Sequence, residues 1–275
     1  MVLDPQLVWN GLVVGSIIAV SALGLTLIFG ILNFINIAYG DYMAAGAYVA
    51  WAVNAQIGLP IGVAIVAGVL FMSVGSVVLD KLVFQHFRTR SPITLLIVSI
   101  GVAFFIRNLL RAIWGPSGHF YDLPLEASPS FVGVRFSIEQ VAIMVTSLLL
   151  LLGVYVMLRR TRVGIAMRAA SDDRMLSRIR GVDTEKLVLY VWLIGGGIAG
   201  LGGIMLGLDA QIRPNMGFTA LIAIFAAVIL GGIGDPKGAV AGGYTIGLAQ
   251  EVSVAVIPSE YKFGVGLVAL IIGLL

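Results

Sequence analysis

The chain of 275 residues contains no cysteine, so disulfide bonds and thiolate metal sites are excluded. It has only two histidines, His86 and His119, and they lie far apart in the sequence, so no histidine-based metal or haem site is expected. Charged residues make up 11% of the chain, against roughly 25% in an ordinary soluble domain. The few positive residues are confined to loops, which is typical of membrane orientation and does not indicate binding to nucleic acid.

Apolar residues take the place of the missing charge. The chain is 59% hydrophobic, with a mean hydropathy of +1.05 and 35 glycines. A soluble fold of this size could not bury so much apolar surface, because its surface must grow with the chain. The apolar runs are continuous and do not alternate, which excludes a strand barrel. We therefore expect an all-α, polytopic helical membrane protein embedded in lipid, with about 8–9 transmembrane segments.

The gaps between charged residues predict where the helices lie, since a spanning helix needs ~20 mostly apolar residues. The expected spans are 9–31, 41–56, 60–83, 93–113, 138–158, 187–208, 218–233, 238–257 and 262–275. The second and seventh are short and are candidates for broken or re-entrant half-helices. The chain starts without a positive n-region, so the first span is expected to be kept rather than cleaved. The last span ends without a basic flank, which leaves a continuation of the native chain beyond Leu275 open.

The distribution of lysine and arginine predicts the orientation. Residues 159–186 hold 8 of the 17 lysines and arginines, with 4 of the 14 acidic residues, and the loop 80–92 holds three more cations. Both are expected in the cytoplasm, and the loop 114–137 is then external and ordered. The N-terminus lies outside if 41–56 crosses the membrane fully, and inside if that segment is re-entrant.

The basic stretch 159–186 has the features of a short amphipathic helix. Ser171 or Asp172 is expected to cap it, with acidic residues in the first turn and arginines in the last, an order that complements the helix dipole. Gly181 follows where a glycine commonly ends a helix. Two interpretations remain open: a basic loop lying on anionic headgroups, or a docking helix for a soluble partner.

Two stretches of the chain resemble known importer sequences. Residues 164–183, "GIAMRAASDDRMLSRIRGVD", followed by "GGGIAGLGGIM", resemble the coupling loop of ABC importer permeases. Residues 24–48, "GLTLIFGILNFINIAYGDYMAAGAY", resemble the branched-chain amino acid permease family, LivH type. Tyr39 stands where that family often has histidine.

A third stretch extends this resemblance to 11–275. Residues 226–250, "AAVILGGIGDPKGAVAGGYTIGLAQ", are similar to the family's cytoplasmic Gly-Gly-x-Gly turn and the helix after it. The resemblance implies that 1–275 is a single permease domain whose coupling loop is 159–186. The residues that it assigns to ATPase coupling are Ala169, Ala170, Ser171, Asp172, Asp173, Arg174, Arg178 and Gly181.

The resemblance also implies the function and the partners. Such a chain is the permease subunit of an ABC importer that moves branched-chain or other neutral amino acids across the inner (plasma) membrane of a bacterium or archaeon. Its partners would be a second homologous permease, two cytoplasmic ATPases and an extracytoplasmic substrate-binding protein. The chain has no G-x-x-x-x-G-K-[ST] phosphate loop, so we expect no enzyme activity and no cofactor here, with ATP and Mg on the ATPases.

A weak internal repeat points to a candidate substrate path. Residues 40–48 and 234–244 both run from Gly-Asp through a small-residue patch to tyrosine, and broken helices at corresponding positions of two halves can mark a transport site. The alternative is that these are packing glycines with ordinary turns. The candidate path residues are Asn33, Asn36, Tyr39, Gly40, Asp41, Gly46, Gly234, Gly242 and Glu251.

Other polar residues in the spans have specific expectations. Asn33 and Asn36 share one face if their segment is helical, and they either pair structurally or line the path. Arg107 and Arg111 are expected to extend outward as interfacial anchors.

Two alternative functions remain open. One is the permease of a related urea or sugar ABC importer. The other is a secondary transporter or channel, which would need an ion or proton relay in spans that hold almost no charge.

Overall fold

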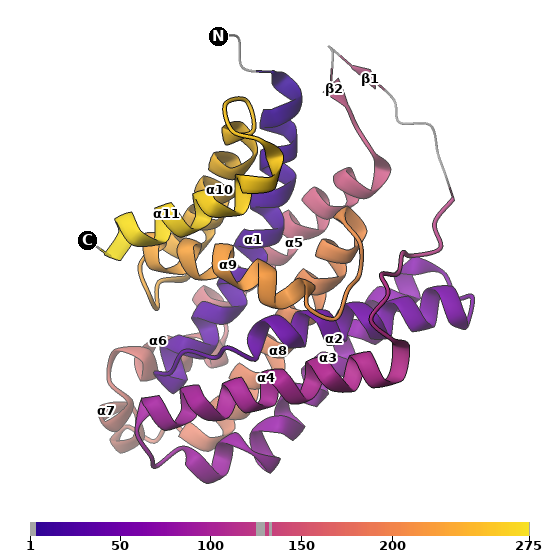
Figure 1. Ribbon diagram of the computed structural model, residues 1–275. Helices are drawn as coiled ribbons and strands as arrows, with labels where there is room; N and C mark the ends of the chain where they lie inside the picture. Colours follow the sequence, from indigo (N-terminus) through magenta and orange to yellow (C-terminus); the bar gives the residue numbers. More distant parts are fainter. Residues whose placement is uncertain (1–3, 125–129, 132–133, 275) are drawn as a thin grey trace.

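The computed structural model describes residues 4–124, 130–131 and 134–274, and this part of the chain is almost entirely helical (Figure 1). Two stretches of the expected outer loop, 125–129 and 132–133, lie outside the described residues. Five of the described helices are long and apolar enough to cross a membrane: α1 (Pro5–Leu32), α3 (Ile61–Leu82), α4 (Pro92–Trp114), α5 (Ile138–Arg160) and α8 (Thr184–Asp209). The predicted all-α membrane fold is confirmed.

The remaining elements are shorter. They are α2 (Tyr39–Trp51) with a π-helical turn (Ala52–Gln56), a 3₁₀ turn (Phe84–Phe87), α6 (Arg162–Asp172), α7 (Arg174–Ile179), α9 (Met216–Gly231), α10 (Pro236–Ser253), a 3₁₀ turn (Ser259–Tyr261) and α11 (Lys262–Leu274). Two short strands, β1 (Ser130–Phe131) and β2 (Val134–Arg135), pair antiparallel. Each of the nine predicted spans contains a helix, and the two expected to be short are α2 and α9.

Three helices begin with the same local signal, a capping side chain followed by proline. Asp4, Ser91 and Asp235 each accept a hydrogen bond from a backbone N–H in the first turn of α1, α4 and α10. Proline fits the next position, since the first N–H groups of a helix have no intrahelical partner. These starts are therefore set by local sequence.

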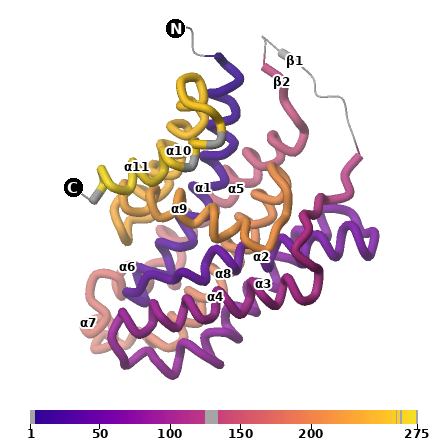
Figure 2. The backbone as a smooth tube through the Cα atoms, viewed as in Figure 1, coloured from indigo at the N-terminus to yellow at the C-terminus, as the bar shows by residue number. Residues whose placement is uncertain are grey.

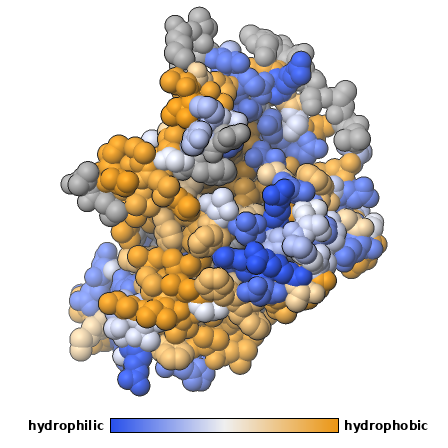
Figure 3. Space-filling view, in the orientation of Figure 1, coloured by the Kyte–Doolittle hydropathy of each residue, from blue (hydrophilic) through white to orange (hydrophobic). Residues whose placement is uncertain are grey.

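Helices α1 and α8 form the centre of the bundle. Both are mostly buried, α1 packs along α10, and α8 packs along α2 and α3. By contrast, α3, α4 and α5 expose many large apolar side chains, as expected of helices that face lipid or another subunit. The visible surface carries wide apolar areas with hydrophilic residues in separate patches (Figure 3).

The bundle has two ends, and α1 runs from one to the other (Figure 2). The Arg-rich end is made of residues 80–90, 159–186 and 232–237. At the opposite end, the Gln6 side chain bonds the backbone of Arg135 at 2.8 and 3.3 Å. The start of α1 therefore lies at the same end as Arg135, which belongs to the expected outer loop. This agrees with a segment 33–56 that crosses the whole bundle, and not with a re-entrant one.

Candidate coupling surface and intramembrane charge pairs

The basic stretch forms two helices, α6 and α7, rather than one. Thr161 caps α6, and Asp173 caps α7 by accepting a hydrogen bond from the Leu176 N–H at 2.9 Å. The expected cap at Ser171 or Asp172 is therefore wrong, because both residues complete α6. Asp173 has extended backbone angles that break the helix there, with φ −151° and ψ 105°.

The end of α7 confirms the expected glycine. Gly181 has φ +86°, a left-handed conformation that favours glycine. Its N–H donates to the Arg178 carbonyl at 3.0 Å, and the Val182 N–H donates to the Ser177 carbonyl at 3.1 Å. These two bonds form a Schellman motif, which satisfies carbonyl groups left free at a helix end. The chain then turns into α8, which Asp183 caps.

Helix α7 presents an apolar face outside the long spans. Met175 is 77% exposed and Ile179 is 76% exposed, with Leu176 beside them. Exposed apolar side chains among arginines are costly in water unless something covers them. Of the residues predicted for coupling, Arg174, Arg178 and Gly181 are exposed with α7, and so are Ala169, Ser171, Asp172 and Asp173, whereas Ala170 is buried.

Ser171 connects this surface to the membrane helices. Its hydroxyl lies close to Gly30 near the end of α1, and a small pocket is lined by both residues together with Gly234 and Met167. The turn around Gly234 therefore belongs to the Arg-rich end. It does not lie at the depth of Gly40, so the two Gly-Asp motifs of the apparent repeat occupy different environments.

Arg88 ties two segments of the Arg-rich end together. Its guanidinium pairs with buried Asp80 near the end of α3 and with Glu185 at the start of α8, at 2.8 Å for Glu185. Arg174 of α7 lines a narrow pocket beside this pair. The loop 80–92 and the stretch 159–186 thus lie on one side, as the charge pattern predicted.

Asn33 and Asn36 do not share a helical face, which corrects that expectation. Asn33 ends α1 with φ +53° and is exposed, and residues 34–38 are not helical. Asn36 is buried, and its Oδ1 accepts a hydrogen bond from the Ala38 N–H at 3.1 Å. The Ile37 N–H donates to the Ser99 hydroxyl of α4 at 3.1 Å. Side-chain oxygens thus accept the backbone hydrogen bonds that a helix would otherwise satisfy, where the backbone unwinds.

Tyr39 and Asp41 lie in the first turn of α2 and are fully buried. Arg107 of α4 binds Asp41 through two parallel hydrogen bonds, Nε to Oδ1 and Nη2 to Oδ2, both 2.9 Å. Its guanidinium also packs over the Phe218 ring of α9, 4.5 Å from the centroid. Arg107 therefore turns inward, and its expected role as an interfacial anchor is wrong. Arg111, one turn further along α4, is exposed as expected.

A second ion pair lies at the end of the bundle opposite the Arg-rich end. Glu251, in the last turn of α10, is only 7% exposed, and its Oε1 accepts a hydrogen bond from Lys262 Nζ of α11 at 2.8 Å. Glu251 therefore ties two helices together close to the end of its span. Sequence reasoning found Glu251 and missed Lys262, because the two are separated by the turn between helices.

Three predicted path glycines lie where backbones touch. A Cβ on Gly46 would sit 2.5 Å from the Cα of Gly200 in α8, and one on Gly40 would sit 2.5 Å from the carbonyl oxygen of Gly217 in α9. A Cβ on Gly242 would overlap the carbonyl oxygen of Ala227. Small residues allow such close helix contacts in membrane proteins. These close contacts are those expected for packing glycines, the alternative to a role in the path, and the path role stays a prediction.

No group of three or more metal-ligating side chains occurs among the described residues. Inside the described bundle, the ion pairs Asp41–Arg107 and Glu251–Lys262 join neighbouring helices.

A family model described as the permease component of the branched-chain amino acid transport system matches residues 7–275. The chain belongs to this permease family. LivH of Escherichia coli K12, a permease protein of the high-affinity branched-chain amino acid transport system, is 29% identical and aligns with 98% of this chain and 92% of its own length. BraD of Pseudomonas aeruginosa is 30% identical over 97% of this chain and 91% of its own. LivM of E. coli is 26% identical over 78% of this chain and 56% of its own length.

A solved structure supports the fold of this branched-chain amino acid permease. PsaBC from Streptococcus pneumoniae, in complex with a Fab, gives a TM-score of 0.54 at 13% identity, covering 97% of this chain and 90% of that chain. At this identity the likeness concerns the fold alone. The family shows the function: a multi-pass membrane permease of a branched-chain amino acid ABC transport system, non-catalytic, with nucleotide binding on ATPase subunits. Matches to both LivH and LivM indicate a heteromeric complex.

The family permease contains functional candidates that sequence reasoning missed. They are Asp80, Arg88, Gly200 and Gly217, together with the pairing of Arg107 with Asp41. For the two arginines a signal existed, since each is a cation next to or inside an apolar run, where an unpaired charge is costly. For the glycines no signal existed, because their partners are remote in the sequence.

For α7 we predict that Asp173 and Asp172 respond differently to reversal. Asp173→Lys removes the cap and places a positive charge at the start of α7, which should cost about 0.5–2 kcal/mol locally and lower uptake severalfold. Asp172→Lys places the charge at the end of α6, where the dipole favours it, and should be close to neutral. Reconstituted leucine uptake measures both. Equal losses in the two variants would contradict the assigned cap.

Proposed function

We propose that α6 and α7 face the cytoplasm and bind an ATPase subunit, so that ATP-driven closure of the ATPases moves the permease. The exposed apolar face of Met175 and Ile179 carries this proposal. The other interpretation, a helix lying on anionic headgroups, predicts that ATPase binding does not depend on Met175 and Ile179. A soluble partner that covers this face explains both the apolar centre and the charged rim.

The assembly that fits this surface has four further subunits: a second homologous permease, two cytoplasmic ATPases and an extracytoplasmic binding protein. The LivH and LivM names, both of permease proteins of one transport system, support a pair of different permeases. The Arg88 and Ser171 contacts support a route for movement. Arg88 connects α3 to the start of α8, and Ser171 connects α6, which leads into α7, to the end of α1.

We place the substrate path beside the unwound residues 33–38 and the start of α2. Non-helical backbone at membrane depth persists only where it is buried in protein or lines a water-filled cavity. Arg107 neutralises Asp41, and Lys262 neutralises Glu251. A path with no net charge suits a zwitterion with an aliphatic side chain, and selection between amino acids is left to the binding protein.

The test of the ATPase-binding face is the double variant Met175→Glu with Ile179→Glu in the intact complex. We expect the ATPases to be lost during purification and leucine uptake to fall at least tenfold, because the apolar contact becomes charged. The control is Val256→Glu, since Val256 is also 76% exposed but lies in the turn after α10, at the opposite end.

Retention of the ATPases by the double variant would contradict the assignment of the face. Uptake of leucine, alanine, glutamate, lysine, urea and ribose by the unmodified complex tests the substrate separately. Urea or ribose uptake without amino acid uptake would refute the amino acid path.

The orientation has its own prediction, made simple by the absence of cysteine. In cells that make the permease without its ATPases, Met175→Cys should resist a membrane-impermeant maleimide and react after permeabilisation, because its side chain is then exposed on the cytoplasmic side. Val256→Cys should react in intact cells. A cysteine at Ser177 would not report the orientation, since this position is 4% exposed and would resist the reagent on either side of the membrane. Ready labelling of Met175→Cys from outside would reverse the topology.

A further inference from the structure

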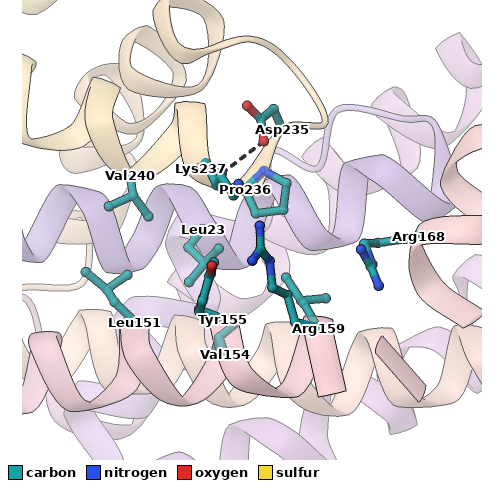
Figure 4. A pocket seen from close by; sticks show the side chains of 11 residues that line it. Leu23, Leu151, Val154, Tyr155, Arg159, Arg168, Asp235, Pro236, Lys237 and Val240 are labelled. Atoms are coloured by element: carbon teal, nitrogen blue, oxygen red, sulfur yellow. Dashed lines mark hydrogen bonds between the residues drawn. The ribbon is translucent and has the colours of Figure 1, made fainter. Parts of the chain in front are cut away.

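A cavity of about 540 Å³ lies between α1, α5 and α10 at the Arg-rich end. Its apolar wall comes from the spans and is made of Leu23, Leu151, Val154, Leu158 and Val240. Its charged end is made of Arg159, Arg168, Asp235 and Lys237 (Figure 4). Leu151 and Val240 lie toward one side of the cavity and Arg168 toward the other (Figure 4). The cavity is therefore amphipathic along the direction of the spans.

The cations at the charged end outnumber the anion. Two of them gather at one ring, since Arg159 lies 4.8 Å and Lys237 lies 6.0 Å from the centroid of Tyr155. Among the described residues, neither these two nor Arg168 takes part in an ion pair. Two like charges near one ring repel each other unless an anion lies between them.

Asp235 can offset only one of these three positive charges. Both of its carboxylate oxygens cap α10, accepting hydrogen bonds from the Lys237 N–H at 3.0 Å and the Gly238 N–H at 3.2 Å. The cavity thus keeps an excess of positive charge at the depth where the spans leave the membrane. An anion bound there would also touch an apolar wall that continues along α5.

We propose that this cavity binds an anionic phospholipid, with its phosphate between Arg159 and Lys237 and an acyl chain along Leu151 and Val240. Basic pockets between membrane helices recognise anionic headgroups, and the apolar wall suits a chain rather than a small ion. The occupant joins α5 and α10 across α1, and so holds the end of the bundle next to α6. This site is separate from the ATPase-binding face on α7, and it stands whether or not that assignment holds.

The experiment is native mass spectrometry of the intact transport complex, titrated with phosphatidylglycerol and, separately, with phosphatidylcholine. We expect preferential binding of phosphatidylglycerol. Arg159→Gln and Lys237→Gln should each weaken it roughly fivefold, as expected for one cation at a membrane surface. Arg160→Gln is the matched control, because Arg160 is the next residue on α5, is exposed, and does not line the cavity. It should change the affinity by less than twofold.

Two further measurements distinguish a phospholipid from other occupants of the cavity. Val240→Trp should fill the apolar wall and lower phosphatidylglycerol binding without changing charge. Inorganic phosphate or leucine, added in excess, should not displace the lipid. Displacement by phosphate would show a simple anion site, and displacement by leucine would show a substrate site; either result overturns the proposal. Equal losses of phosphatidylglycerol affinity in Arg159→Gln and Arg160→Gln would also overturn it. So would unchanged affinity in every variant, which is the result expected if the second permease covers the cavity.

Discussion

Arg107→Ala is expected to destabilise the protein by about 3–5 kcal/mol, because it leaves the Asp41 carboxylate buried without its partner. The two parallel hydrogen bonds from Arg107 are the only hydrogen bonds that the described structure gives this carboxylate, whose side chain is fully buried. The variant also loses the packing of the guanidinium on Phe218. The measurement is thermal unfolding of the purified complex together with leucine uptake, and both should fall sharply.

The control for this prediction is Arg111→Ala, on the next turn of the same helix. Arg111 is exposed, so its removal should change the unfolding temperature very little. Asp41→Asn combined with Arg107→Gln should recover part of the lost stability, since no charge is then left unpaired. If Arg107→Ala unfolds at the same temperature as the unmodified protein, the pair does not hold α2 against α4.

Gly46→Leu is the second large prediction, and it should abolish leucine uptake. The Cβ of the new side chain would lie 2.5 Å from the Cα of Gly200, and this neighbour is backbone that cannot rotate away. Gly68 of α3 packs on the same turn of α2, since a Cβ there would approach the carbonyl oxygen of Gly46 at 2.7 Å. Overpacking of a core commonly costs 1–3 kcal/mol, and about that or more is expected where three helices meet.

Gly101→Leu is the matched control, since Gly101 on α4 is exposed and a Cβ there meets nothing within 4 Å. It should insert and transport normally. For Gly46→Leu, a lower unfolding temperature and a lower yield of assembled complex would show that helix packing is lost, rather than a transport path blocked. A Gly46→Leu complex that assembles with normal stability but does not transport would instead place Gly46 on the path. Normal uptake by that variant would show that the α2–α8 contact is not close.

The spans were predictable because their signal is local. Each apolar run has a length that the bilayer sets, and caps such as Asp4 and Ser91 with the following proline mark helix starts. The basic stretch 159–186 was recognisable by composition and by family resemblance. Its internal break was not, because Ser171, Asp172 and Asp173 are all good capping residues, and the choice depends on how α6 packs against the end of α1.

The pairing of charges could not be read from the sequence. Asp41 and Arg107 are 66 positions apart, and an arginine near the end of a span is as consistent with outward extension as with an inward pair. Asn33 and Asn36 looked like one helical face, because the sequence does not show that the chain unwinds after Leu32. The orientation of Ser177 on a six-residue helix likewise depends on what lies beneath it.

The sequence by itself determined the membrane class, the approximate positions of the helices, the Arg-rich end and the family. These follow from hydropathy, charge and short motifs, which act along the chain. Only the tertiary structure decided which residues meet: Asp41 with Arg107, Glu251 with Lys262, Gly46 with Gly200, and α1 with α10. The physical reason is that a low-dielectric interior requires every charge and unwound backbone group to find a partner, and that partner is chosen by helix packing across the whole chain.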